Sequence, residues 1–223
     1  MEGKTTAEKG KDGNDVDTKY LPKLVVFDLD NTVWTPELYE LYNMPRPNKD
    51  IKIFPATMAA LKELANDKKW AGSKFAAASR TGQIKWAYNL LPKFQITPEK
   101  TLDDLFSFKA KLSRFFSNKF TRILCRGYVM CSVKELEIYP GSKLAHFKKL
   151  KKDSGLEYHE MIFFDDDSCN TREVSSLGVF CVYNPYGLSE ELWKLGITEY
   201  VKHRATGSTK GKTVGGSKYY SDD

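Results

Sequence analysis

The feature that most constrains the fold is an apolar run that stops abruptly at two carboxylates. Residues 23–33 read Lys-Leu-Val-Val-Phe-Asp-Leu-Asp-Asn-Thr-Val, so Asp28 and Asp30 follow the run directly. An apolar run rich in β-branched residues is typical of a strand that is buried in a parallel sheet. Ligands of such sheets bind just beyond the carboxyl ends of the strands. The sequence therefore predicts an α/β fold with Asp28 and Asp30 at the functional edge of its sheet.

Two carboxylates at one strand end need a counter-ion. Burying two like charges side by side costs several kcal/mol when no cation accompanies them. A divalent metal ion is the simplest partner. The alternative is a strand that ends in an ordinary polar turn, in which Asp30 or Asn31 caps the next segment. This segment by itself leaves both interpretations open.

Three later segments carry polar residues in comparable positions. Ala76–Thr81 reads as a strand that ends at the hydroxyl residue Ser79, and Tyr139–Lys143 places Lys143 at the start of a predicted helix. Residues 161–166 form another apolar run, which ends at Asp165 and Asp166. Taken singly, Ser79 would be a helix N-cap and Lys143 a solvated lysine of a first helical turn. Four such segments in order indicate a catalytic site instead.

These four segments resemble, in order, the four motifs of the haloacid dehalogenase-like phosphohydrolases. Their residues are similar to those of the eukaryotic magnesium-dependent phosphatases of this superfamily, and the similarity extends over roughly residues 21–200. The resemblance implies a Rossmann-like three-layer sandwich around a central parallel sheet, capless or with a minimal cap insertion. It also implies Mg²⁺-dependent hydrolysis of phosphate monoesters through a phosphoaspartyl intermediate.

The resemblance further implies a role for each motif residue. Asp28 would be the nucleophile, and Asp30 the general acid that protonates the leaving oxygen and then activates water. Ser79 and Lys143 would bind the phosphate and its developing negative charge. Arg80 would either contact the substrate phosphate or pair with a surface carboxylate.

The implied metal ligands are oxygen atoms, which magnesium prefers. They are the carboxylates of Asp28 and Asp166 and the main-chain carbonyl of Asp30, with Asp165 positioning the metal, a water or Lys143.

Leu29, Asn31 and Trp34 are predicted to contact the substrate. Close relatives tend to carry an aromatic residue where this chain has Asn31. If that side chain lines the leaving-group pocket, the substrate preference should differ from theirs.

Composition restricts the other classes of function. The chain has 223 residues and a formal net charge of +6, and it lacks a run of roughly 18 apolar residues, a signal peptide and a glycosylation sequon. Its four cysteines and three histidines are scattered, which disfavours a zinc site. The lysines at 148, 149, 151 and 152 lack the interleaved aromatics of a nucleic-acid surface. We expect a cytoplasmic protein, with a nuclear location as the alternative, that has no membrane or nucleic-acid partner.

Strand and helix signals alternate along the chain, which predicts βαβ units. Strands are predicted at about 24–28, 74–78, 136–139, 161–165 and 179–183, and helices at about 55–66, 82–91, 142–152, 170–177 and 188–195. Residues 1–19 and 204–223 are polar and aperiodic, so both are predicted to be disordered tails that flank one domain over 20–203.

Two segments of that domain remain outside the motifs. Residues 33–54 are predicted to form a substrate-shaping flap with Trp34, Tyr39 and Tyr42, unless these aromatics only cover the core edge. Residues 95–135 form a basic insert with a predicted amphipathic helix near 102–117. This insert would be a small cap, would dock a protein partner, or would only extend the fold.

The substrate class follows from how open the site is. An open site would admit large leaving groups, including phosphotyrosine on a protein. The alternative is a phosphatase of small molecules such as sugar phosphates, enclosed by the flap and the insert. A non-catalytic binding module is disfavoured, because every motif residue is present.

Overall fold

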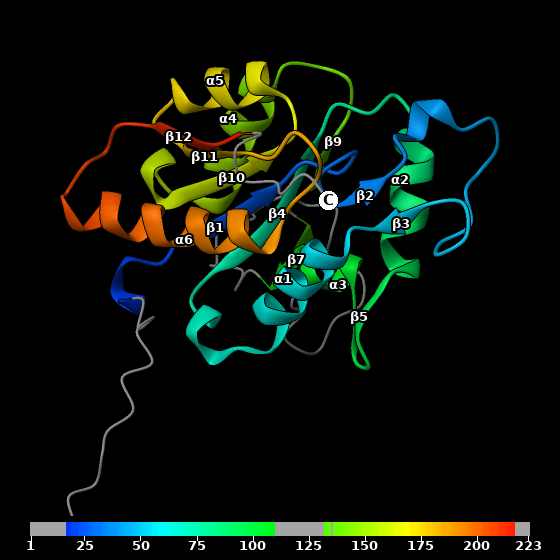
Figure 1. The fold of residues 1–223 in the computed structure, drawn as a ribbon, viewed down its shortest axis with the longest axis horizontal. Coiled ribbons are helices and arrows are strands. Elements are labelled where there is room, and N and C mark those ends of the chain that lie inside the picture. The colour runs from blue at the N-terminus through cyan, green and yellow to red at the C-terminus, as the bar shows by residue number, and fades with distance from the viewer. Residues whose placement is uncertain (1–16, 110–131, 135, 217–223) are drawn as a thin grey trace, which may run out of the picture.

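The computed structural model describes residues 17–109, 132–134 and 136–216. A six-stranded sheet forms its centre, in the order β12-β11-β10-β1-β4-β9 (Figure 1). Its strands are β1 Leu24–Phe27, β4 Lys74–Ser79, β9 Leu136–Ile138, β10 Met161–Asp165, β11 Phe180–Tyr183 and β12 Lys212–Gly215. Every neighbouring pair is parallel. This arrangement confirms the predicted α/β class with a central parallel sheet.

Helices cover both faces of this sheet, and alternation along the strands decides which side chain meets which helix. The helices are α1 Pro55–Asn66, α2 Ile84–Leu90, α3 Leu102–Leu105, α4 Lys143–Ser154, α5 Ser168–Ser175 and α6 Glu190–Ala205. Val25 and Phe27 of β1 belong to the core that also contains buried residues of α1 and α6. Leu24 and Val26 belong to the other core, with Phe147 of α4 and Val174 of α5. The result is the predicted three-layer sandwich (Figure 1).

Smaller elements decorate this framework. Three antiparallel pairs are β2 Trp34–Thr35 with β3 Lys52–Ile53, β5 Gln95–Thr97 with β6 Lys100–Thr101, and β7 Ser107–Lys109 with β8 Ser132–Lys134. Short 3₁₀ helices are η1 Thr18–Tyr20, η2 Leu38–Glu40, η3 Lys68–Trp70, η4 Leu91–Lys93 and η5 Tyr158–Glu160. Within the described ranges, no helix combines the length and the apolar character needed to cross a membrane.

The prediction of a disordered C-terminal tail from residue 204 is wrong for the part that the structure describes. Helix α6 extends to Ala205, and β12 then adds a parallel strand to the sheet edge. A Cβ atom on Gly211 would lie 1.8 Å from the Ser175 carbonyl oxygen, and one on Gly215 would lie 2.4 Å from that of Tyr183. These two glycines therefore permit close backbone packing. Residues 1–16 and 217–223 lie outside the described residues.

The predicted amphipathic helix near 102–117 is also wrong where it can be compared. Thr101 and Asp104 form a capping box that starts a helix, but α3 ends at Leu105. The chain then enters β7, which pairs with β8, so strand pairing replaces the helix after one turn. The rest of the proposed helix, residues 110–117, falls outside the described part of the chain.

Candidate active site

The end of β1 brings Asp28 to the carboxyl edge of the sheet. The Asp28 amide donates to the Phe164 carbonyl (2.9 Å), which continues the pairing of β1 with β10 by one residue. Phe27 is in register with Phe164 on one side and with Ala77 on the other. Asp28 and the residues that follow Phe164 and Ala77 therefore lie side by side at the carboxyl end of the sheet. Asp28 is 7% exposed there.

A tight turn then places Asp30. The amides of Val33 and Trp34 donate to the Leu29 carbonyl (2.8 and 3.0 Å), and Asn31 adopts the left-handed backbone with φ of 55°. This turn folds the indole of Trp34 back, so that its Nε1 donates to Asp30 Oδ1 (2.7 Å). The Leu38 amide donates to the same oxygen (3.3 Å). Two donors thus fix the orientation of the Asp30 carboxyl group.

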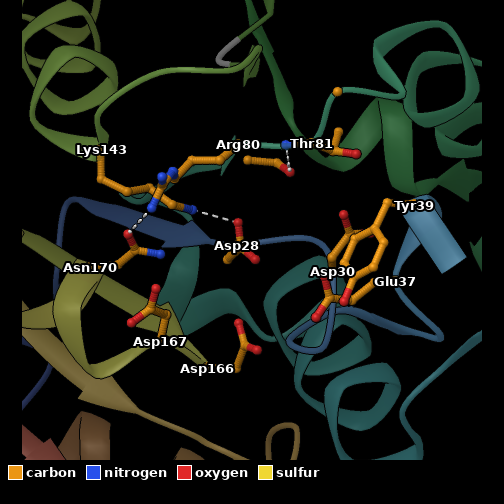
Figure 2. Close-up of a pocket in the computed structure, with 12 residues that line it drawn as sticks. Asp28, Asp30, Glu37, Tyr39, Arg80, Thr81, Lys143, Asp166, Asp167 and Asn170 are labelled. Atoms are coloured by element: carbon orange, nitrogen blue, oxygen red, sulfur yellow. Dashed lines mark hydrogen bonds and ion pairs between the residues drawn. The ribbon is translucent and has the colours of Figure 1, made fainter.

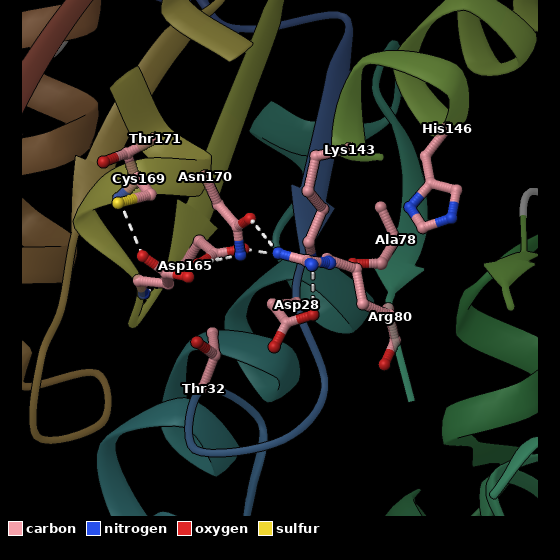
Figure 3. A network of polar contacts seen from close by, with 12 residues as sticks. Asp28, Thr32, Ala78, Arg80, Lys143, His146, Asp165, Cys169, Asn170 and Thr171 are labelled. Atoms are coloured by element: carbon pink, nitrogen blue, oxygen red, sulfur yellow. Dashed lines mark hydrogen bonds and ion pairs between the residues drawn. The ribbon is translucent and has the colours of Figure 1, made fainter. Parts of the chain in front are cut away.

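Lys143 enters the site from the first turn of α4, which Ser142 caps. Its side chain is 1% exposed, and its Nζ lies 2.5 Å from Asp28 Oδ1 and 3.0 Å from Asp165 Oδ2 (Figure 3). It also donates to the Ala78 carbonyl. Burial by itself would lower the pKa of Lys143, but its contacts with Asp28 and Asp165 raise the pKa overall. The alternative of a solvated first-turn lysine is therefore wrong.

Asp165 is fully buried, and its oxygens are engaged by protein groups. Asn170 Nδ2 donates to both of them (3.1 and 3.2 Å), and the Asp167 amide donates to Oδ1 (2.8 Å). Asn170 in turn accepts a hydrogen bond from Arg80 Nη1 (3.1 Å). Of the roles predicted for Asp165, the orientation of Lys143 is the one that this geometry supports.

A cavity of about 310 Å³ opens at this edge of the sheet. It is lined by Asp28, Asp30, Glu37, Tyr39, Ser79, Arg80, Thr81, Gly82, Lys143, Asp166, Asp167 and Asn170 (Figure 2). The structure thus brings together residues from all four sequence motifs. Ser79 is buried and accepts from the Thr81 amide (3.3 Å). It is not a helix cap, because α2 begins at Ile84 with Gln83 as its N-cap.

Three of the predicted substrate contacts are not among the residues that line this cavity. The side chains of Leu29 and Trp34 are fully buried, because the turn packs both into the core. Trp34 instead orients Asp30, as described above. The Asn31 side chain donates to Glu37 Oε1 (2.7 Å), so it contacts a residue that lines the cavity and does not line the cavity itself.

Sequence reasoning missed several lining residues. Thr81 and Gly82 directly follow Ser79 and Arg80, and Asp167 and Asn170 follow Asp166 into α5, so proximity to the motifs was an available signal. Tyr39 was assigned to the predicted flap. Glu37 had no distinguishing signal, because only the path of residues 34–38 brings it to the cavity wall.

Negative charge dominates the cavity. Its described lining contains five carboxylates, Asp28, Asp30, Glu37, Asp166 and Asp167, and two cations, Arg80 and Lys143. Burial and the neighbouring Asp165 raise the pKa of Asp166 to about 7. Burial also raises the pKa of Asp30, against the hydrogen bonds from Trp34 and Leu38. An additional cation would stabilise this set of carboxylates.

The donor set fits magnesium. Among the described residues, no three His, Cys, Asp or Glu side chains converge closely enough to hold a metal without other ligands. Magnesium commonly binds through one or two carboxylates and keeps several waters. Asp28 and Asp166, which both line the cavity, provide two such carboxylates.

Comparisons with known proteins agree with this geometry. A family model described as acid phosphatase matches residues 20–203. Magnesium-dependent phosphatase 1 of Homo sapiens is 32% identical over 194 residues, which cover 82% of this chain and 89% of the human protein. A HAD-like hydrolase superfamily protein of Schizosaccharomyces pombe is 32% identical over 171 residues, which cover 71% of this chain and 83% of that protein.

Among solved structures, one that aligns is the N-terminal part of a Bacteroides fragilis protein, which contains a phosphatase domain and is complexed with Mg. The alignment has a TM-score of 0.46 and 15% identity, over 84% of this chain and 41% of that one. The family match includes all four motifs and nearly the whole described domain. The chain belongs to the acid phosphatase family.

Proposed function

We propose that the protein is a Mg²⁺-dependent phosphatase that hydrolyses phosphate monoesters through a phosphoaspartate on Asp28. The observation that carries this proposal is the position of Lys143, buried between Asp28 and Asp165 at the wall of a cavity. A buried cation beside a carboxylate suits a site that binds a phosphoryl group and stabilises its transition state.

Asp28 acts as the nucleophile. Lys143 holds its Oδ1, so Oδ2 is the oxygen that attacks phosphorus. A bond forms between Oδ2 and phosphorus while the bond to the ester oxygen breaks. The Ser79 hydroxyl donates to the transferring group, and the positive charge of Lys143 lies beside it at the wall of the cavity. Splitting hydrolysis into two displacements in this way lowers the barrier of each.

Asp30 transfers the proton in both steps. Burial raises the pKa of Asp30, which favours the protonated form that a general acid needs. Its proton goes to the leaving oxygen in the first step. In the second step Asp30 accepts a proton from the water that attacks the phosphoaspartate, which releases inorganic phosphate and restores Asp28. Trp34 and Leu38 keep the carboxyl group in one orientation throughout.

Mg²⁺ would be held by the carboxylates of Asp28 and Asp166 and by the main-chain carbonyl of Asp30. When bound, it supplies positive charge that neutralises the nucleophile and the phosphate oxygens. Asp165 orients Lys143 and is not needed as a ligand in this assignment.

The favoured substrates are monoesters with a large or aromatic leaving group, including protein phosphotyrosine. Tyr39 supports this choice, because the residue is 69% exposed and lines the cavity beside Asp30 (Figure 2). Small sugar phosphates are the alternative class. A protein-docking or capping role of residues 95–135 stays a prediction, because most of that segment lies outside the described residues.

Hydrolysis of phenyl phosphate with Mg²⁺ and with EDTA tests the proposal. Asp28→Asn should abolish turnover and prevent hydroxylamine-sensitive labelling of the protein by phosphate. Asp153→Asn, which removes an exposed carboxylate of α4, is the matched control and should retain activity. Full activity of Asp28→Asn, or full activity in EDTA, would contradict the mechanism. Phosphotyrosine peptides and sugar phosphates then decide between the two substrate classes.

A further inference from the structure

Glu37 lines the cavity but has no part in the chemistry described above. It lies with Asp30 and Tyr39 on one side, across from Lys143, Arg80 and Asn170 (Figure 2). Asp30 protonates the leaving oxygen, so this side of the cavity receives the leaving group. We propose that Glu37 selects substrates by charge, and that the site prefers phosphate monoesters whose leaving group carries a cation. This inference rests on the proposed phosphatase function.

The position of Glu37 is fixed by its neighbours. Trp34 and Leu38, on either side of it in sequence, both donate to Asp30 Oδ1. Asn31 Nδ2 donates to Glu37 Oε1 at 2.7 Å. The turn of Asn31 is itself fixed, since its amide donates to the Trp34 carbonyl at 2.8 Å. The segment that orients the general acid Asp30 therefore also holds the Glu37 carboxylate in place.

The negative charge of Glu37 is not cancelled by a cation. Within the described part of the chain, no lysine or arginine forms a salt bridge with it, and its partner Asn31 is a neutral amide. The two cations of the cavity lining are engaged elsewhere: Lys143 lies between Asp28 and Asp165, and Arg80 donates to Asn170. A charged group on the leaving-group side therefore meets the field of Glu37 directly.

Tyr39 adds to the same preference. Its exposed ring lines the cavity next to Glu37, and the face of a tyrosine ring attracts cations. A leaving group that carries an ammonium group would gain from both residues. One that carries a carboxylate or a second phosphate would be repelled by Glu37 and would gain nothing from the ring.

Three phenyl phosphates with para substituents test this inference: aminomethyl, hydroxymethyl and carboxymethyl. The methylene group keeps their intrinsic reactivities similar, and the neutral hydroxymethyl compound serves as the reference for each enzyme. At near-neutral pH with saturating Mg²⁺, we expect the native protein to prefer the ammonium compound. Two unit charges about 6 Å apart, at a dielectric of about 40 to 80, change kcat/KM about threefold to tenfold. Glu37→Gln should therefore reduce the ammonium-to-carboxylate ratio about tenfold or more.

Two further variants make the test specific. Asn31→Gly keeps the left-handed backbone, since glycine adopts positive φ freely, but it removes the amide that holds Glu37. It should lose part of the ratio. Glu40→Gln removes an exposed carboxylate of η2, the 3₁₀ helix that directly follows Glu37, and should keep the ratio of the native protein because Glu40 does not line the cavity.

The outcomes are distinguishable. An unchanged ratio in Glu37→Gln, or the same loss in Glu40→Gln, would overturn the charge selection while leaving the phosphatase function intact. A native protein that prefers the carboxylate compound would do the same. Absence of Mg²⁺-dependent hydrolysis of all three compounds would refute the phosphatase function itself, and this inference with it.

Discussion

Replacement of Lys143 by methionine tests how far one buried ammonium group stabilises the site. The substitution keeps an unbranched side chain of similar length but removes the charge that lies 2.5 Å from Asp28 and 3.0 Å from Asp165. Both carboxylates are almost inaccessible to water. Removing one partner of a buried ion pair typically costs about 3–5 kcal/mol. We expect the free energy of unfolding to fall by that amount at pH 7 in EDTA.

An independent route gives a similar value. The variant can avoid a bare buried charge if Asp28 binds a proton in the folded state. A carboxyl group with an ordinary unfolded pKa of about 3.9 needs about 4 kcal/mol to remain protonated at pH 7, because each pH unit corresponds to about 1.4 kcal/mol. Protonation of Asp28 therefore sets an upper limit of about 4 kcal/mol on the penalty at pH 7, and this limit falls to about 1.5 kcal/mol at pH 5.

The pH dependence gives the prediction its sign. Burial already raises the pKa of Asp28 in the folded native protein, and Lys143 opposes this rise. Without Lys143 the folded-state pKa of Asp28 lies higher still, so between the two folded-state values the variant binds more protons than the native protein. Stability should therefore rise as pH falls, and the difference from the native protein should shrink from pH 7 to pH 5. Urea unfolding at both pH values, in EDTA, measures this difference.

Lys148→Met is the matched control, because Lys148 is an exposed residue of the same helix. It should change stability by less than about 0.5 kcal/mol at either pH. A loss below about 1 kcal/mol for Lys143→Met at pH 7, or a loss that does not depend on pH, would refute the reasoning. Lys143 would then be accessible to water or unpaired in the protein.

Three other perturbations address the general acid and the edge of the sheet. Asp30→Asn should slow turnover of phenyl phosphate by about 10²–10⁴-fold, while calorimetry should still detect Mg²⁺ binding, since the main-chain carbonyl remains; near-native turnover would exclude Asp30 as the acid. Trp34→Phe removes the donor to Asp30 Oδ1 and should slow phenyl phosphate more than nitrophenyl phosphate, which needs less protonation; equal effects on both would mean that Trp34 only packs the core. Gly211→Ala places a Cβ atom 1.8 Å from the Ser175 carbonyl oxygen, so it should cost about 1–3 kcal/mol of stability and expose β12 to proteases. Gly72→Ala, with nothing within 4 Å of its Cβ atom, should do neither.

The sequence predicted the centre of this protein well because its signals there are local. The apolar runs of β1 and β10 are buried along their whole length, and their short length and polar boundaries are typical of buried strands. The helix predicted at 55–66 matches α1 residue by residue, since Pro55 marks its first turn. The predicted helix over 188–195 was too short. It ended before Gly196, but α6 continues through this residue to Ala205. A glycine fits at this position because a Cβ atom would come close to Val182 and Phe164.

The catalytic set was accessible for the same reason. Asp28, Asp30, Ser79, Lys143 and Asp166 each stand at a strand end or a helix start, and parallel pairing carries all of these ends to one edge. Position in the sequence therefore implied position in space.

Only the tertiary structure decided which neighbours complete the site. Whether Trp34 contacts substrate or orients Asp30 depends on a turn that folds the indole inward. Whether Glu37 reaches the cavity depends on Asn31 and on the path of the chain to Leu38. Residues 212–215 of the predicted tail form a strand, and Gly211 and Gly215 at its two ends allow the backbones of Ser175 and Tyr183 to approach closely. These outcomes depend on how turns and packing direct individual side chains and bring backbones together, which local composition does not encode, whereas the strand ends and their carboxylates were already determined by the sequence.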